Sequence, residues 1–266
     1  MDLGLAAKSC AVTGASRGIG LEVARRLSRE GASILLLARS ADALERGVAE
    51  CRREGGPAVG VPMDVTEPDA GERIVDAAVE RFGKLDVLVN NAGTSKRWPL
   101  EEVSDEAWQA AWEINVMAPL RAMRVAAPHM AERGWGRIVN VSSTAGKRPS
   151  ALMPEYSVAK AAELSLSRLF ADRYAARGVL VNAVCPGPTK SELWMAPGGL
   201  LDQARELGGH QSREEALESA AAGRPIHRLA EVGEIADAIV FLCSERASYV
   251  SGAAWSVDGG TVQVII

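Results

Sequence analysis

The chain has 266 residues, of which 47% are hydrophobic and 24% are charged, and its formal net charge is −4. This length suits one large α/β domain with a sizeable core, and the acidic balance disfavours a nucleic-acid binder, which would carry a basic excess. No apolar run approaches the roughly 18 residues of a membrane span, and the early acid Asp2 argues against a secretory signal.

Short apolar runs alternate with segments of helical period along the whole chain. Strands are expected at 9–12, 33–38, 58–62, 85–89, 137–141, 179–184 and 253–257, where Val, Ile and Leu follow one another with little polar alternation. A first helix buries Ile19, Val23 and Leu27 and stops at Gly31, and further helices are expected at 41–54, 67–82, 105–133, 157–177 and 231–244. This alternation predicts a single doubly wound α/β domain over residues 1–266, with a mainly parallel sheet and helices on both faces.

Residues 190–224 break this rhythm. They include Pro197-Gly198-Gly199 and an amphipathic stretch at 213–222. A long insertion in a compact domain is usually a binding loop, so we expect a substrate-binding lid here, with a passive surface excursion as the alternative.

A glycine-rich turn follows the first strand and opens the first helix, in the sequence Thr13-Gly14-Ala15-Ser16-Arg17-Gly18-Ile19-Gly20. Gly14 allows a sharp turn, Gly18 allows the backbone to approach a diphosphate, and Gly20 allows helix and strand to pack closely. The helix N-terminus then offers N–H groups to the phosphates. The turn predicts a dinucleotide site whose contacts are Gly14, Ser16, Arg17, Gly18, Ile19 and Gly20.

The spacing Gly-x-x-x-Gly-x-Gly resembles that of the short-chain dehydrogenase/reductase family. Further landmarks of that family follow in order over nearly the whole chain: Asp64-Val65, Asn90-Asn91-Ala92-Gly93, Pro186-Gly187, Ser251-Gly252 and Val257-Asp258-Gly259-Gly260. The motif content is similar to that of 3-oxoacyl-acyl-carrier-protein reductases. The resemblance implies a Rossmann-type seven-stranded sheet in the order 3-2-1-4-5-6-7 and further cofactor contacts at Asp64, Val65, Asn91, Ala92, Gly93, Pro186, Gly187 and Thr189.

The resemblance also implies a homotetramer assembled through the long helices at 105–133 and 157–177. The apolar end of the chain, Val264-Ile265-Ile266, suggests burial at a subunit contact.

Charge at the end of the second strand favours NADP(H) over NAD(H). An acid there would bond the ribose 2′-hydroxyl and repel a 2′-phosphate, but the chain has Ala38-Arg39-Ser40 and a second cation at Arg17. Two guanidinium groups suit a divalent phosphate. The alternative is that Arg39 is only a solvated residue at the start of a helix.

Tyr156 and Lys160 are four residues apart at the start of a predicted helix, which places them on one face. The ammonium is expected to bring the tyrosine pKa down from about 10 toward working pH. Ser143 precedes Tyr156 by a spacing similar to that of the catalytic Ser and Tyr of the family, with Ser142 as the alternative. Asn115 matches the family's helix asparagine.

These four residues imply reversible hydride transfer between a nicotinamide and a carbonyl or alcohol carbon. Tyr156 would exchange the proton as general acid/base, and Ser143 would orient the substrate oxygen. By family analogy, Lys160 would also hold the nicotinamide ribose, Asn115 would hold a relaying water, and Thr189 would contact the carboxamide. Ser191 stands where the family often has Thr.

Two pairs of cations, Lys96-Arg97 and Lys147-Arg148, follow neighbouring strands. If they converge, they would steer an anionic or carrier-linked substrate, whereas the alternative is a solvated surface. An apolar wall around the substrate is expected from Trp98, Met153, Leu193, Trp194 and Met195, with Lys96 beside it. Substrate contacts are therefore expected at Lys96, Trp98, Met153, Leu193 and Trp194.

Metal and thiol chemistry are not expected. The three histidines share no metal-like spacing. The four cysteines, Cys10, Cys51, Cys185 and Cys243, lack C-x-x-C spacing and are typical of reduced thiols in a cytoplasmic protein, with Cys185 in the core.

The leading function is therefore an NADP(H)-dependent carbonyl reductase or alcohol dehydrogenase acting on a small molecule. One alternative is an NAD-dependent alcohol or sugar dehydrogenase. An enoyl reductase is disfavoured, because relatives with that activity space Tyr and Lys more widely. An alternative from another class is a nucleotide-sensing protein that has lost catalysis, against which the complete Asn, Ser, Tyr and Lys set argues.

Overall fold

The computed structural model describes residues 2–263, and the chain end at 264–266, predicted to lie at a subunit contact, falls outside them. Seven parallel strands form one sheet in the order β3-β2-β1-β4-β5-β6-β7, as predicted. The strands are β1 (Ser9–Thr13), β2 (Ser33–Ala38), β3 (Ala58–Pro62), β4 (Val87–Asn90), β5 (Gly136–Val141), β6 (Val179–Pro186) and β7 (Ala254–Val257). Each begins and ends within two residues of its predicted range.

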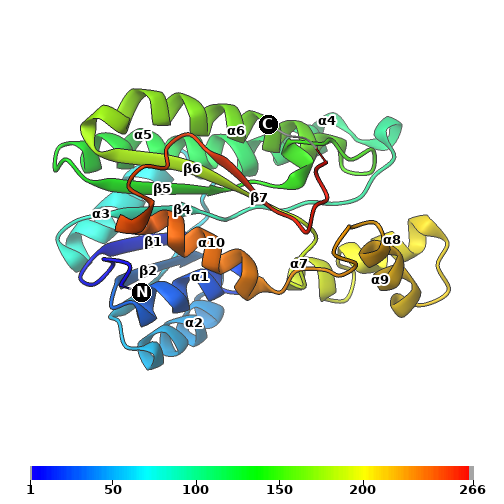
Figure 1. The fold of residues 1–266 in the computed structure, drawn as a ribbon, viewed down its shortest axis with the longest axis horizontal. Helices are drawn as coiled ribbons and strands as arrows, with labels where there is room; N and C mark the ends of the chain where they lie inside the picture. Colours follow the sequence, from blue (N-terminus) through cyan, green and yellow to red (C-terminus); the bar gives the residue numbers. More distant parts are fainter. Residues whose placement is uncertain (1, 264–266) are drawn as a thin grey trace.

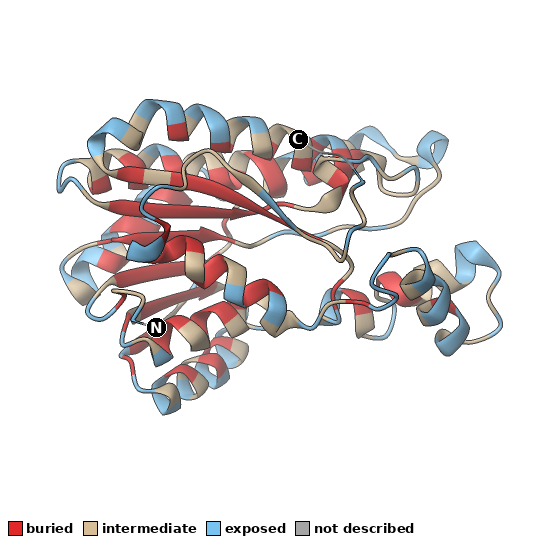
Figure 2. Cartoon of the chain, viewed as in Figure 1, coloured by how far each residue is buried: buried red, intermediate tan, exposed pale blue. Residues whose placement is uncertain are grey.

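Helices cover both faces of the sheet (Figure 1). One layer holds α1 (Gly18–Arg29), α2 (Ala41–Glu54) and α10 (Val232–Cys243), and the other holds α3 (Ala70–Phe82), α4 (Asp105–Trp112), α5 (Ala118–Ala131) and α6 (Pro154–Tyr174). Alternate residues of each strand point to opposite layers: along β1, Cys10 and Val12 join one apolar cluster and Ala11 joins the other. Burial therefore concentrates along the strands and the inner helix faces (Figure 2).

The long helix predicted over 105–133 is interrupted. Between α4 and α5 the chain forms a wider π-helical turn, Glu113–Met117. Pro119, near the start of α5, has no N–H to donate to the carbonyl four residues earlier, which belongs to Asn115, and its ring clashes with that carbonyl. The helix widens at that point, which is a common arrangement at functional sites.

Two other helices begin away from their predicted starts. The start of α3 moves from 67 to Ala70, because Asp64 and Thr66 close a local turn: the carboxylate accepts from the Thr66 N–H (3.0 Å) and hydroxyl (2.7 Å). The start of α6 moves from 157 to Pro154, whose fixed φ suits the first turn of a helix. A helix that combines the length and apolar character of a bilayer-spanning segment is absent from residues 2–263.

The insertion at 190–224 is folded. It contains α7 (Glu192–Met195), α8 (Leu200–Gly208) and α9 (Arg213–Ala222), and α8 and α9 lie apart from the sheet layers (Figure 1). Its core is a small apolar cluster of Trp194, Leu200, Leu201 and Ala216 with Leu229. Met153, just before α6, packs against this cluster and so joins the insertion to the main body.

Candidate active site

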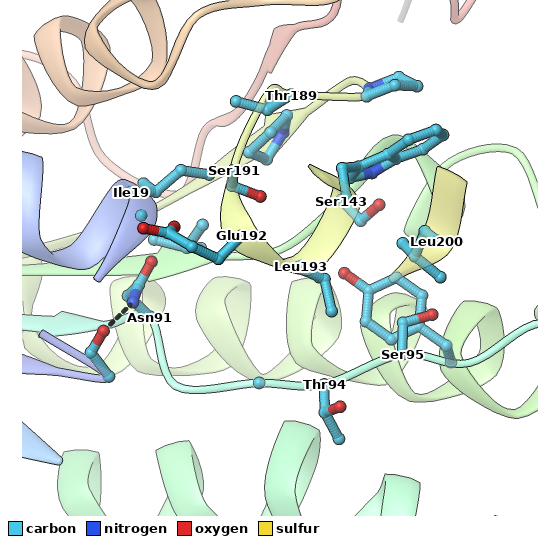
Figure 3. Close-up of a pocket in the computed structure, with 18 of the residues that line it drawn as sticks. Ile19, Asn91, Thr94, Ser95, Ser143, Thr189, Ser191, Glu192, Leu193 and Leu200 are labelled. Atoms are coloured by element: carbon cyan, nitrogen blue, oxygen red, sulfur yellow. Dashed lines mark hydrogen bonds between the residues drawn. The ribbon is translucent and has the colours of Figure 1, made fainter. Parts of the chain in front are cut away.

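A cavity of about 2280 Å³ lies at the carboxyl ends of the strands, between the glycine-rich turn and the insertion. Most of the predicted cofactor and catalytic residues line it: Gly14, Ser16, Arg17, Gly18, Ile19, Arg39, Ser40, Asp64, Val65, Asn91, Ala92, Gly93, Ser143, Tyr156, Lys160, Pro186, Gly187 and Thr189. Two predicted residues, Gly20 and Asn115, are buried behind its wall and do not line it. Ser143, Ser95 and Leu200 lie at one end of the view in Figure 3, and Ile19, Asn91 and Glu192 at the other.

The glycine-rich turn has the backbone that a diphosphate requires. Gly14 and Gly18 have φ values of +65° and +58°, which favour glycine. A Cβ on Gly18 would project across the cleft to 3.1 Å from the carboxylate of Glu192 in α7. The first turn of α1 contains no acid and no capping side chain, so its N–H groups are available to an anion.

Gly20 acts through packing. A Cβ there would lie 2.5 Å from the Gly14 carbonyl oxygen and closer still to the Asn91 side-chain nitrogen. This space lets Asn91 donate to the carbonyls of Thr13 (2.9 Å) and Gly14 (3.2 Å), and Figure 3 draws the bond from Asn91 to this turn. The Thr13 hydroxyl accepts from the N–H groups of Asn91 (2.9 Å) and Ala92 (3.0 Å). The loops after β1 and β4 are thereby fixed to each other.

The end of the cavity nearest β2 is cationic. Arg17 and Arg39 are exposed, and neither pairs with a carboxylate within residues 2–263. The Ser40 hydroxyl caps α2 by accepting from the Ala43 N–H (3.3 Å). The nearby acid, Asp64, is engaged by Thr66, whose N–H and hydroxyl lower its pKa, and the positive charge of Arg39 lowers this pKa further.

Sequence reasoning missed two charged residues of this region, Arg46 and Glu50, which line the cavity from α2. Helical periodicity offered the signal, because Ala43, Arg46, Gly47 and Glu50 follow the i, i+3, i+4, i+7 pattern and share one face.

Tyr156 and Lys160 share one face of α6, with the Lys160 nitrogen 5.8 Å from the centre of the Tyr156 ring. Ser142 and Ser143 both line the cavity, and Ser143 lies beside the Tyr156 hydroxyl, where its hydrogen bond lowers the tyrosine pKa. The Ser142 hydroxyl instead donates to the Lys160 carbonyl (3.1 Å). The Ser143 hydroxyl also accepts from the Ala145 N–H (3.1 Å), which fixes its rotamer toward the cavity.

The prediction for the tyrosine pKa was wrong in direction. Loss of solvent raises the pKa of Tyr156, and this effect outweighs the lowering by Lys160 and Ser143. A partner that sequence reasoning missed adds to this effect: the Lys160 nitrogen donates to the Glu163 carboxylate at 2.9 Å, and both groups are buried. Burial lowers the pKa of Lys160, but Glu163 and Tyr156 together with Cys185 more than offset this, and Glu163 also raises the pKa of Tyr156.

Glu163 had a signal in the sequence, since it follows Lys160 by three residues and Tyr156 by seven, on the same helix face. The Lys160 nitrogen donates a second bond to the Val141 carbonyl at the end of β5 (2.8 Å). Both acceptors hold the ammonium in one place.

Asn115 lies in the π-helical turn and points to the same region. Its amide donates to the carbonyls of Ala111 (3.0 Å) and Thr94 (3.4 Å). Its side-chain oxygen is buried and has no partner among the residues described. A Cβ on Gly93 would lie 2.9 Å from this oxygen and 3.8 Å from the Lys160 nitrogen, so both atoms border the glycine.

The substrate end differs from the prediction. Lys96 stacks on Trp98, with its nitrogen 3.7 Å from the ring centre, and neither side chain lines the cavity. Lys147 is drawn to β7, where it donates to the Ala254 carbonyl (2.6 Å) and the Ser256 hydroxyl (3.0 Å). Each lysine therefore has a partner outside the cavity.

Three of the other four members of the predicted apolar wall border the cavity. Met153, Leu193 and Trp194 line the cavity, and Met195 does not. Arg97 and Arg148 line it as well, together with an arginine that sequence reasoning missed, Arg224, at the end of the insertion.

Within residues 2–263, no three potential metal ligands gather. Cys185 is buried beside Pro186, and burial raises the pKa of its thiol to about 11, which leaves it protonated and inert.

The model of the family described as "short chain dehydrogenase" matches residues 8–198. A cis-4-hydroxycyclohexanecarboxylate dehydrogenase from Sinomonas cyclohexanicum is 39% identical, covering 99% of this chain and 100% of that protein. The crystal structure of L-sorbose reductase from Gluconobacter frateurii, complexed with NADPH and L-sorbose, superposes with a TM-score of 0.92 at 36% identity over 100% of both chains. NAD⁺-bound xylitol dehydrogenase superposes with a TM-score of 0.88 at 30% identity, covering 96% of this chain and 99% of that one.

Proposed function

We propose that this chain, which belongs to the short-chain dehydrogenase family, uses NADP(H) to interconvert a small ketone and its secondary alcohol. The family places it among the NAD(P)-dependent oxidoreductases that act on CH–OH or C=O groups. In this proposal Tyr156 is the general acid/base. The observation that carries the proposal is the grouping of Ser143, Tyr156 and Lys160 on a cavity whose other end has a diphosphate turn and two arginines without acidic partners.

The residues present fit a nicotinamide dinucleotide. Gly14 and Gly18, in backbone conformations that favour glycine, shape the turn at the free N-terminus of α1, which suits the diphosphate. Arg17, just before α1, and Arg39, just before α2, suit a 2′-phosphate, since the N-terminus of α2 and the guanidinium groups attract it. The related reductase that holds NADPH supports this preference, whereas the related xylitol dehydrogenase holds NAD⁺.

The bound nicotinamide would supply or accept the hydride. Tyr156 gives a proton to the carbonyl oxygen during reduction and takes it from the hydroxyl during oxidation. Ser143, fixed by the Ala145 N–H, donates to the same oxygen and orients it. Lys160 holds positive charge beside Tyr156 and binds the nicotinamide ribose, and the free oxygen of Asn115 accepts from a water that serves Lys160.

Further cofactor contacts in this proposal come from Asp64, Val65, Asn91, Ala92, Gly93, Pro186, Gly187 and Thr189, all on the cavity wall. Residues 190–224 cover the substrate, with Leu193 and Trp194 as the apolar contacts. The relative named for cis-4-hydroxycyclohexanecarboxylate supports a ring-borne secondary alcohol as substrate. A cytoplasmic homotetramer stays a prediction.

Fluorescence titration with NADPH and NADH tests the cofactor. We expect NADPH to bind more tightly than NADH. Arg39→Ala should weaken NADPH binding by roughly tenfold or more, because each charge-assisted phosphate bond contributes about 1.5–3 kcal/mol. Arg53→Ala is the matched control, since Arg53 is an exposed arginine of α2 outside the cavity. Tighter binding of NADH would favour the NAD-dependent alternative.

Turnover of a ketone panel under the tighter cofactor tests catalysis. The panel includes cyclohexanone and 4-oxocyclohexanecarboxylate, and oxidation of NADPH with either ketone is the expected result. Cofactor binding without turnover of any member would contradict the proposed reaction and favour a nucleotide-sensing protein.

A further inference from the structure

Three arginines from three separate segments line the substrate end of the cavity. Arg97 belongs to the loop after β4, Arg148 to the loop after β5, and Arg224 to the end of the insertion, just after α9. Burial lowers the pKa of Arg97, and the positive charge of Arg224 lowers it further. Burial and the positive charge of Arg148 likewise lower the pKa of Arg224. The Arg224 guanidinium is therefore close enough to Arg97 and to Arg148 to repel both.

No acid balances this charge within the part of the chain described. Arg25 of α1, whose Nε is also buried without a hydrogen bond, shows the usual solution. Its terminal nitrogens pair with Glu22 and Glu54, and the Glu50 carboxylate lies 3.6 Å from the Nε. By contrast, the groups that act on the pKa of Arg97 and Arg224 include no carboxylate. Like charges without a counter-charge destabilise a fold, so a cluster of this kind is suited to an anion supplied from outside.

Two donors of the cluster have no acceptor. The Nε–H groups of Arg97 and Arg224 are buried and lack a partner among residues 2–263. The rest of each head group is held in place: Arg97 lies over the Trp194 ring, 5.6 Å from its centre, and Arg224 donates to the Ala220 carbonyl. Buried N–H groups without an acceptor are costly, and a carboxylate at the cavity wall would offer its oxygens to this cluster.

The segments that carry the cluster are tied together. The Arg97 N–H donates to the Gln203 side chain in α8 (2.8 Å), and the Trp98 N–H donates to the Leu152 carbonyl (3.0 Å). Apolar side chains of the insertion, Leu200 and Ala216 among them, line the same cavity as Tyr156. A hydrocarbon body would therefore fit against the insertion while its charged group meets the arginines.

We infer that the substrate carries a carboxylate away from its reacting carbon, and that Arg97, Arg148 and Arg224 bind this carboxylate. This inference rests on the proposed function, because it takes the reaction at Tyr156 as given. The planar guanidinium fork matches a carboxylate in two parallel bonds, and the partly buried Arg97 and Arg224 suit a small acid that enters the cavity.

The kinetic test compares 4-oxocyclohexanecarboxylate with its methyl ester, which has the same carbon skeleton without the charge. With saturating NADPH, we expect Arg224→Met and Arg148→Met each to lower kcat/KM for the acid by roughly 10- to 100-fold, a loss typical of one charge-assisted contact, and to change kcat/KM for the ester by less than about threefold. Arg205→Met is the control. It removes the same charge from the insertion at a residue outside the cavity, whose ionic partner is its neighbour Glu206.

Equal kcat/KM values for acid and ester in the wild type, or equal losses for both in Arg224→Met, would overturn the inference while leaving the oxidoreductase intact. Acetoacetyl-coenzyme A is a second comparison substrate. Its negative charges are phosphates that lie far from its reacting carbonyl, so it presents an anion other than a carboxylate. A preference for this thioester over the acid would also overturn the carboxylate assignment.

A calorimetric titration with cyclohexanecarboxylate in the presence of NADP⁺ separates this inference from the proposed function, because the compound has no carbonyl to reduce. Binding to the wild type and to Arg205→Met, with loss in Arg224→Met, supports the anion site even if no ketone turns over. Absence of binding to the wild type overturns it.

Discussion

Substitution of Gly20 by alanine tests how the glycine-rich turn is joined to the rest of the cavity. The added Cβ would stand 2.5 Å from the Gly14 carbonyl oxygen, and since 3.4 Å is an ordinary contact, the neighbours must move by about 0.9 Å. Overpacking of this kind costs about 1–3 kcal/mol. Displacing Asn91 also weakens its bonds to Thr13 and Gly14, each contributing about 0.5–1.5 kcal/mol.

Alanine is itself the better helix former by about 1 kcal/mol, which offsets part of this loss. We therefore expect Gly20→Ala to lower the free energy of unfolding by about 3 kcal/mol, and Tm by about 6–12 °C for a chain of this size. Gly223→Ala is the control, because its φ is −71° and the nearest atoms to an added Cβ are 3.8 Å away. It should leave stability unchanged or raise it by about 0.4–1 kcal/mol.

Urea unfolding followed by circular dichroism gives the free energy, and NADPH titration gives the effect on the site. NADPH should bind more weakly to Gly20→Ala and normally to Gly223→Ala. If Gly20→Ala melts within about 1 °C of the wild type, or if both variants lose the same stability, the close packing of the two loops is not what Gly20 provides.

Three further outcomes follow from the buried titratable groups. Burial raises the pKa of Tyr156, and reduction needs the phenol, so the rate of ketone reduction should stay level through neutral pH and fall only above about pH 10; a fall near pH 8 would contradict this. Glu163 raises the pKa of both Lys160 and Tyr156, so Glu163→Gln should move that alkaline fall to lower pH; an unchanged profile would exclude this role. The four cysteines are buried, so they should react with a thiol reagent at pH 8 only after unfolding in urea; modification of the native protein would show an accessible thiolate.

The local parts of the fold were predictable from the sequence. Strands buried on both faces appear in the sequence as runs of Val, Ile and Leu. The turn around Gly14 and Gly18 needs residues that tolerate positive φ, so it can be recognised from its glycines. The spacing of Tyr156 and Lys160 on one helix likewise fixes their shared face.

Features that depend on competition between partners were harder to predict. Lys147 follows a strand at the cavity, yet its ammonium finds acceptors on β7, which is distant in the sequence. The tyrosine pKa depends on Glu163 as well as on Lys160, and a pairwise view of Tyr and Lys omits it. Arg224 lines the cavity from the end of the insertion, whose folding around Trp194 has no simple periodic signal in the sequence.

The measurement that tests the proposed reaction most directly is a single-turnover reduction with Tyr156→Phe, monitored by NADPH absorbance after a separate titration of NADPH binding. The substitution removes one hydroxyl from the cavity wall and leaves the glycine-rich turn and Arg39 untouched. We expect NADPH affinity and Tm to match those of the wild type, while the reduction rate falls by roughly 100-fold or more, as expected for loss of a general acid. A variant that keeps most of its reduction rate would contradict the assignment of Tyr156 as the proton donor.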